Sequence, residues 1–250
     1  VHGPATSPRA AMAALLHSEG LGRSFPKSVI AEADAVADEA TVVDPGRRDL
    51  TDQRVITIDP AGAKDHDDAI AVAAEGDLIR LWVHIADVAR YVRHGGAIDA
   101  EAARRGNSVY VPGTVDPMLP DRLSSDICSL RPGADRKVVT AEMLIDADGE
   151  VTETRFYRAL IHSQQRLTYP QVDALFAGGS LGNAVLEADI DVARTLSERM
   201  RVRRMKRGAL GIETAEPSFV FDDDRLVGVE MEGQTPAHSL VEECMIAPNE

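Results

Sequence analysis

Residues 55–72 of this chain, VITIDPAGAKDHDDAIAV, determine how the rest of the sequence is interpreted. Apolar runs at 55–58 and 69–72 enclose a Pro/Gly turn and four aspartates. Short apolar runs bounded by turn residues predict two strands joined by a tight connection. The four aspartates are Asp59, Asp65, Asp67 and Asp68.

These carboxylates would repel one another if the connection holds them together. Two carboxylates about 4 Å apart repel by about 4 kcal/mol at an effective dielectric of about 20. Flanking strands would keep the loop from opening, and clustered carboxylate oxygens suit Mg²⁺ or Mn²⁺. An EF-hand is a poor match, because no glycine follows Asp68 and Gly76 stands where a bidentate glutamate would fall. We expect all four aspartates to hold Mg²⁺, with Mn²⁺ as a second choice, and a solvated acidic turn is the alternative.

The bulk composition places the chain among ordinary soluble globular proteins, with 44% hydrophobic and 27% charged residues in 250. No apolar run approaches a membrane span, and the short Ala-rich segment 10–16 is a poor signal-peptide core. Val1 is not an initiator methionine, which is consistent with an excerpt or a processed chain. Cys128 and Cys244 have no metal-ligand spacing, so we expect reduced, buried thiols and a cytoplasmic protein.

The net charge of −14 is unusual for a nucleic-acid binder, but cations concentrate near the end of one expected helix, 190–207. Complementing a helix dipole is worth less than about 1 kcal/mol per charge, and six cations exceed that need. Like charges this dense require anions, which favours a phosphate backbone as the partner. The six are Arg199, Arg201, Arg203, Arg204, Lys206 and Arg207.

The remaining pattern predicts an α+β fold, with a mixed, largely antiparallel sheet core and surrounding helices. His84 and Asp87, in and after an apolar strand, are expected to be a core histidine and a structural hydrogen-bonding residue. Further strands are expected at 78–86, 107–111, 137–145 and 150–161, and helices at 7–20, 25–39, 95–105, 167–178 and 239–249.

The motif IDP at 58–60 followed by KDHDDA at 64–69 resembles the active-site signature of the RNase II/RNase R (RNB) family of exoribonucleases. Stretches 78–92, 108–130 and 240–247 resemble later family signatures in the same order. The resemblance, roughly 46–249, implies an RNB-type fold. Residues 1–50 would form a helical lead-in, and 51–250 the N-terminal and central part of a catalytic domain that continues beyond the given chain. The family's later arginine-rich catalytic segment would follow Glu250.

By the same resemblance, the activity is metal-dependent, hydrolytic 3′→5′ degradation of single-stranded RNA to nucleoside 5′-monophosphates. Asp67 and Asp68 would carry the chemistry. Tyr110 matches a base-stacking tyrosine that helps to set the length of the end product, although spacing alone leaves a core tyrosine equally open. Tyr169 matches a ribose-recognising tyrosine, and Glu242 or Glu243 a ribose-contacting glutamate. Ile212 stands where several relatives carry an aromatic base-stacking residue.

Two other functions stay open at this point. The chain could be a catalytically silent RNA-binding relative. It could also be a metal-dependent phosphodiesterase of other specificity, or merely a cation-stabilised structural module. Single-stranded RNA is the expected partner, and the sequence indicates neither a membrane partner nor an obligate protein partner.

Overall fold

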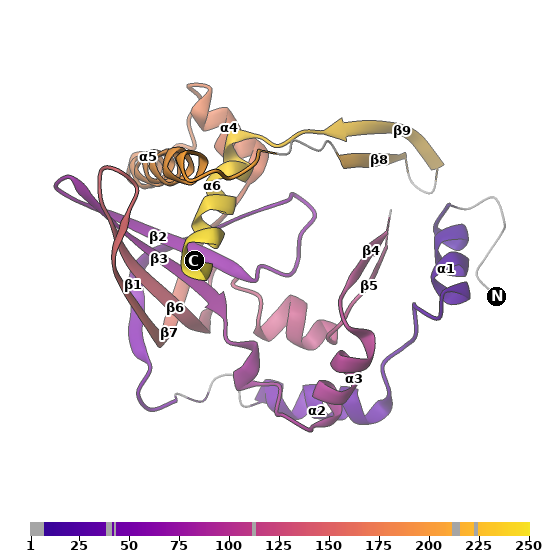
Figure 1. Cartoon of the computed structure of the whole chain (residues 1–250). Coiled ribbons are helices and arrows are strands. Elements are labelled where there is room, and N and C mark those ends of the chain that lie inside the picture. Colours follow the sequence, from indigo (N-terminus) through magenta and orange to yellow (C-terminus); the bar gives the residue numbers. More distant parts are fainter. Residues whose placement is uncertain (1–7, 39–41, 43, 112–113, 212–215, 223–224) are drawn as a thin grey trace. The chain divides into compact units, whose positions relative to one another are not determined.

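The computed structural model describes residues 8–38, 42, 44–111, 114–211, 216–222 and 225–250, which divide into two compact units (Figure 1). The larger unit comprises Val42–Val88, Ser125–Ile212 and Gln234–Glu250. The smaller unit comprises Val1–Thr41, Ala89–Ser124 and Glu213–Gly233.

The larger unit contains a closed five-stranded barrel in the order β1-β2-β3-β6-β7. Neighbouring strands are antiparallel except β1 and β7, which are parallel. This confirms the mixed, largely antiparallel sheet. An odd number of alternating strands must close on one parallel pair, because the first and last strands run in the same direction. The strands are β1 (Arg48–Asp59), β2 (Asp68–Glu75), β3 (Leu78–Ala86), β6 (Asp135–Ile145) and β7 (Val151–Thr168).

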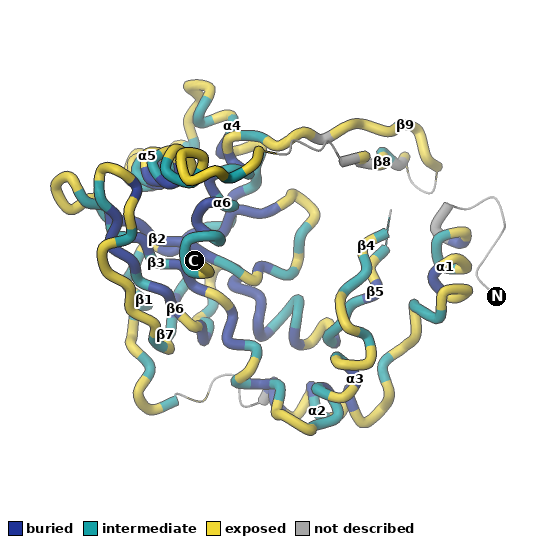
Figure 2. The backbone as a smooth tube through the Cα atoms, in the orientation of Figure 1, coloured by how far each residue is buried: buried dark blue, intermediate teal, exposed yellow. Residues whose placement is uncertain are grey.

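Three helices of the same unit pack on this barrel: α4 (Tyr169–Phe176), α5 (Ala184–Lys206) and α6 (Pro236–Ile246), the last followed by η3 (Ala247–Asn249). The buried stripe of α5 recurs every three or four residues, as an amphipathic helix requires, and joins the barrel side chains in one core (Figure 2). This helix begins earlier than expected, because Asn183 accepts a hydrogen bond from the Leu186 N–H at 3.2 Å and caps it.

The hairpin turn between β6 and β7 packs against α5. Gly149 has φ of +79°, and a Cβ there would lie 2.5 Å from the Arg199 carbonyl oxygen. Both the left-handed backbone and the close approach require glycine. The strands expected at 137–145 and 150–161 are therefore joined by a tight turn at Asp148-Gly149. β7 runs on to Thr168, past the expected end at 161, because it pairs with β1 along that length.

The described residues of the smaller unit form three α-helices and two isolated hairpins. In its described part, α2 packs on α3, whose first turn is capped by the Glu32 carboxylate through the Ala97 N–H at 2.6 Å. Its elements are α1 (Pro8–Ser18), α2 (Lys27–Asp38), α3 (Ala97–Arg105), β4 (Val109–Val111), β5 (Thr114–Asp116), β8 (Glu216–Asp222) and β9 (Arg225–Glu232). Two short turns lie in the sequence where the chain passes between the units: η1 (Val88–Arg90) and the π-helical η2 (Arg122–Ile127).

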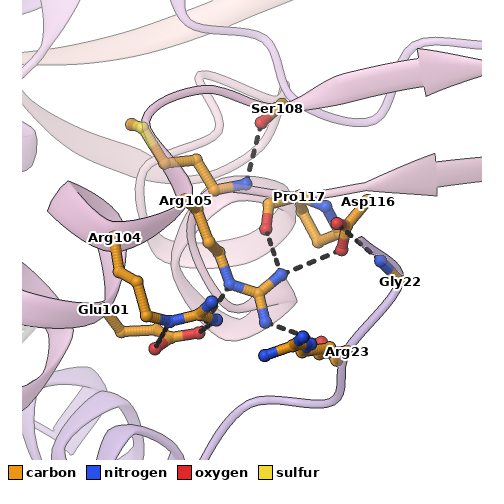
Figure 3. Close-up of polar contacts among 9 residues, drawn as sticks. Gly22, Arg23, Glu101, Arg104, Arg105, Ser108, Asp116 and Pro117 are labelled. Atoms are coloured by element: carbon orange, nitrogen blue, oxygen red, sulfur yellow. Dashed lines mark hydrogen bonds and ion pairs between the residues drawn. The ribbon is translucent and has the colours of Figure 1, made fainter. Parts of the chain in front are cut away.

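Arg105, at the end of α3, joins three segments of the smaller unit (Figure 3). Its guanidinium donates to Glu101 at 2.8 Å, to Asp116 at 2.9 Å and to the Arg23 carbonyl at 2.6 Å. It also lies 3.8 Å from the centre of the Phe25 ring. Paired, hydrogen-bonded and stacked, this buried arginine fixes the β4–β5 hairpin to α3 and the segment before α2.

Both cysteines are free and buried, as expected. Burial raises the pKa of Cys128 and of Cys244 to about 12, so neither thiol is a nucleophile at neutral pH. Among the described residues, no helix combines the length and the apolarity that crossing a membrane requires.

Candidate active site

The acidic residues gather at one end of the barrel because of strand order and register. Asp59 is the last residue of β1 and Asp68 the first of β2, and the connection between them carries Asp65 and Asp67. In the parallel pair, Asp59 lies beside Thr168 at the end of β7. Tyr169, the next residue, therefore begins α4 at the same end of the barrel.

A neighbouring segment holds this connection in place. The Ser129 hydroxyl donates to the Lys64 carbonyl at 2.8 Å and accepts from the His66 N–H at 3.2 Å. The His66 carbonyl in turn accepts from the Leu130 N–H at 2.8 Å. Arg166 donates to the carbonyls of residues 60 and 61. The loop is tied at both ends and cannot freely separate its charges.

The carboxylates interact as the sequence predicted. Burial first, then the charges of Asp59 and Asp67, raises the pKa of Asp68 to about 6. Burial and the charges of Asp65 and Asp59 also raise the pKa of Asp67, while His66 lowers it. Because the Asp67 side chain reaches solvent, water screens much of this effect. Nearby carboxylates thus disfavour the charged forms of Asp67 and Asp68, which is the electrostatic setting that a bound cation relieves.

Asp59 and His66 are the most buried polar residues of this acidic connection, 8% and 4% exposed. His66 Nδ1 lies 2.8 Å from Asp59 Oδ2, but the two atoms are not aligned as a hydrogen bond, and each lacks another partner. Across the described residues, no three His, Cys, Asp or Glu side chains are gathered closely enough to hold a metal as they stand. The donor types and these orphaned atoms fit a divalent cation, and the four-aspartate ligand set stays a prediction.

Tyr169 has a stacking partner that the sequence reading missed. Its ring lies 3.8 Å from that of His238, at an interplanar angle of 21°. His238 Nδ1 contacts the Thr235 hydroxyl at 2.7 Å within the capping box that begins α6. Burial, followed by the charges of Asp68 and Asp59, raises the pKa of Tyr169, so its phenol stays protonated and can donate a hydrogen bond. The sequence TPAH at 235–238 is typical of a capped helix start, and it is the local pattern from which His238 could have been noticed.

Tyr110 lies on β4 of the smaller unit, 67% exposed. The core alternative for this residue is therefore wrong, and base stacking stays a prediction. Ile212 lies outside the described residues.

The basic stretch at the end of α5 already has carboxylates opposite it. Arg204 pairs with the buried Glu243 at 2.6 Å and, more loosely, with Glu242 at 3.4 Å. Arg203 lies 3.6 Å from Glu150, and Arg207 2.7 Å from Glu250. Much of the repulsion that suggested a phosphate partner is thus balanced within the chain.

Two cations of this stretch, Arg201 and Lys206, are exposed and form no ion pair with any described residue. Arg199 instead donates to the Asp77 carbonyl at 3.1 Å. Of the two glutamates, Glu243 is committed to Arg204, and Glu242 is the more accessible. RNA contact by this stretch and by either glutamate stays a prediction.

The structural roles expected for His84 and Asp87 are confirmed. His84 is buried, its Nδ1 lies 2.9 Å from the Thr140 hydroxyl, and burial lowers its pKa to about 3. The ring is therefore neutral and is not a base at neutral pH. Asp87 pairs with buried Arg47 at 2.6 Å.

A pH dependence follows from the raised pKa of Asp68. Between about pH 4 and pH 6 the native carboxyl keeps a proton that the unfolded chain has lost, so stability falls as the pH rises through this window. We expect the free energy of unfolding of the metal-free protein to fall by about 2 kcal/mol relative to Asp68→Asn. Urea titrations in EDTA at several pH values measure this difference, and a constant difference would contradict the raised pKa.

Known proteins with similar sequences belong to one family. The family described as RNB domain matches residues 47–250. Ribonuclease R of Mycoplasmopsis pulmonis is 38% identical over 228 residues, covering 90% of this chain and 31% of the relative. Ribonuclease R of Thermotoga maritima is 42% identical over 234 residues, covering 90% and 33%. The chain thus spans about a third of the length of these curated relatives.

Two solved structures with a similar fold come from the same kind of protein. The apo form of Mycoplasma genitalium RNase R matches with a TM-score of 0.91 and 32% identity, over 100% of this chain and 40% of that one. The same RNase R in complex with ribose-methylated single-stranded RNA matches with a TM-score of 0.88 and 31% identity, over the same shares of the two chains.

Proposed function

The chain belongs to the RNB domain family, and on this premise we propose that it is the RNA-hydrolysing part of a 3′→5′ exoribonuclease. The reaction would be metal-dependent hydrolysis of single-stranded RNA to nucleoside 5′-monophosphates. Residues 51–250 would form part of its catalytic domain, with 1–50 as a lead-in. The observation that carries the proposal is the group of mutually repelling carboxylates held at one end of the barrel beside Tyr169.

The residues have distinct parts in this reaction. Asp59, Asp65, Asp67 and Asp68 would hold one or two ions of Mg²⁺ or Mn²⁺. A divalent ion bound there lowers the pKa of coordinated water and offsets charge on the phosphoryl oxygens. Of the four, Asp68 lies where the loop joins β2, and its pKa is raised to about 6. A cation bound beside it would therefore favour loss of its proton near neutral pH.

Substrate recognition would use Tyr169 and Glu242 for the sugar and, apart from this acidic end, Tyr110 of the smaller unit for a base and two cations of α5 for phosphates. The protonated phenol of Tyr169 can donate to a ribose 2′-hydroxyl, which distinguishes RNA from DNA. Glu242, the accessible glutamate, can accept from the same group. Exposed Tyr110 would stack on a base, worth about 1–3 kcal/mol, and Arg201 and Lys206 would meet phosphates. Solved structures of a related RNase R hold ribose-methylated single-stranded RNA and double-stranded RNA, so they support an RNA substrate, and the preference for single strands rests on the family resemblance. Free, buried thiols suit a cytoplasmic location.

Polarity and sugar preference test this proposal. A 5′-labelled oligoribonucleotide should shorten stepwise from its 3′ end, while DNA of the same sequence should be cut at least about tenfold more slowly, because each lost hydrogen bond to a fixed donor is worth about 1 kcal/mol or more. Tyr169→Phe should narrow the difference between RNA and DNA. Tyr157→Phe is the matched control, since that hydroxyl binds Glu142 on the barrel wall.

Each outcome of this assay has a defined meaning. Equal rates on RNA and DNA would favour a general phosphodiesterase. Tight RNA binding without cleavage, in the presence of Mg²⁺ or Mn²⁺, would show a silent RNA-binding relative instead.

A further inference from the structure

We propose that His66 supplies an imidazole nitrogen to the cation site at Asp59, and that the site therefore prefers Mn²⁺ to Mg²⁺. This inference rests on the metal-dependent function proposed above and adds a nitrogen donor to its four aspartates.

The first support is an unsatisfied pair of buried atoms. Asp59 Oδ2 and His66 Nδ1 lie 2.8 Å apart, and neither has an aligned hydrogen-bond partner among the described residues. Buried polar atoms are nearly always paired, because an unpaired one costs about 1–3 kcal/mol. Two orphaned atoms that face each other at this distance need a shared proton or a shared cation.

The second support is the spacing of these atoms. In an octahedral shell with bonds of about 2.1 Å, adjacent ligand atoms lie about 3 Å apart. The observed 2.8 Å is close to this value, so one ion could contact both atoms with little movement of either side chain. The other aspartates would need to turn toward the ion, since no three potential ligands are gathered among the described residues.

The third support is the way His66 is held. Its N–H donates to the Ser129 hydroxyl and its carbonyl accepts from the Leu130 N–H, so both peptide groups beside the ring are fixed. The residue is 4% exposed although it lies in a connecting loop between strands. A loop histidine whose ring is buried against a carboxylate cannot swing into water, and its nitrogen stays at the acidic end of the barrel.

The choice of metal follows from donor chemistry. Carboxylate and water oxygens suit Mg²⁺ and Mn²⁺ alike, so the four aspartates do not choose between these two ions. An imidazole nitrogen is a ligand for first-row transition ions and a poor one for Mg²⁺. Mn²⁺ accepts both carboxylate oxygen and imidazole nitrogen. The competing explanation is a protonated His66 that pairs with Asp59 and never touches the metal.

Pulsed electron paramagnetic resonance of the purified protein loaded with Mn²⁺ separates these two arrangements. We expect nitrogen modulation from a directly bound imidazole in the unmodified protein and in the matched control His94→Leu, whose histidine is fully exposed. His66→Leu should lose the modulation. Bound Mn²⁺ without nitrogen modulation in the unmodified protein would overturn the proposal, and that measurement does not depend on the folding of any variant.

Affinity gives a second readout that is independent of activity. By calorimetry, His66→Leu should bind Mn²⁺ about 10- to 100-fold more weakly, while its Mg²⁺ affinity changes by less than about threefold, because Mg²⁺ gains little from a nitrogen donor. Equal losses for the two ions would contradict a nitrogen ligand. Circular dichroism in EDTA checks that the variant is folded.

Asp68→Asn distinguishes failure of this inference from failure of the proposed function. If Mn²⁺ binding depends on Asp68 but shows no nitrogen modulation, only the role of His66 is refuted. If Mn²⁺ binding ignores both Asp68 and His66, the acidic end of the barrel is not the metal site, and both proposals are refuted.

Discussion

Replacement of Asp68 by Asn should abolish RNA hydrolysis while leaving RNA affinity within a few-fold of the unmodified protein. The amide keeps the shape of the side chain but removes one charge from the proposed cation site. Losing one fixed group that stabilises a transition state commonly costs about 3–4 kcal/mol, or a hundred- to a thousand-fold in rate. Asp68 begins β2 and is partly buried, so neighbouring groups have little freedom to replace it.

Single-turnover cleavage of a 5′-labelled single-stranded RNA measures this loss, and filter binding measures the affinity. Asp148→Asn is the matched control, because this exposed aspartate lies in the β6–β7 turn. EDTA should remove the activity of the unmodified protein, and Mg²⁺ or Mn²⁺ should restore it. Hydrolysis by Asp68→Asn at the rate of the control would show that the acidic connection is not the catalytic centre.

Local patterns were sufficient to locate most of the elements around this centre. Strand 78–86 was predicted with its observed bounds, because its apolar run ends at turn residues on both sides. The helix before Gly106 was correct because that glycine adopts φ of +81° at the C-cap. The acidic connection was located between its two strands for a similar reason, because apolar runs enclose it on both sides. The cation that it is expected to hold stays a prediction.

Features that depend on distant pairing were not accessible in this way. Nothing local indicates that β1 and β7 close a barrel as a parallel pair, although that register places Tyr169 beside Asp59. The β8–β9 hairpin was not predicted, and neither was the stacking of His238 on Tyr169.

The basic stretch shows the same limit in its electrostatics. Counting its cations suggested unmet repulsion, but the carboxylates opposite them come from the β6–β7 turn and from α6, 38 or more residues away for the Arg204 pairs. Charge balance is a property of the folded arrangement rather than of a sequence window.

The largest expected effect on stability comes from the ion pair of Arg47 and Asp87. Their side chains are 5% and 2% exposed, and Arg47 Nη2 lies 2.6 Å from Asp87 Oδ2. Arg47 also donates to the Val138 carbonyl at 3.2 Å, so it is fixed against the barrel. Buried Lys137 lies nearby, with its carbonyl accepting from the Asp87 N–H. The Lys137 ammonium lies 3.8 Å from Asp44, whereas Asp87 is the carboxylate nearest to the Arg47 guanidinium.

Asp87→Ala should lower the free energy of unfolding by about 3–5 kcal/mol, because it leaves the guanidinium of Arg47, whose side chain is 5% exposed, with one anion fewer. Asp87→Asn keeps a hydrogen-bond acceptor and should lose less. Glu153→Ala is the control: its pair with Arg155 is solvent-exposed, so its loss should stay below about 1 kcal/mol. Urea denaturation followed by circular dichroism measures all three. If Asp87→Ala were as mild as the control, Arg47 would have to be neutralised by other groups, such as Asp44 at 3.0 Å.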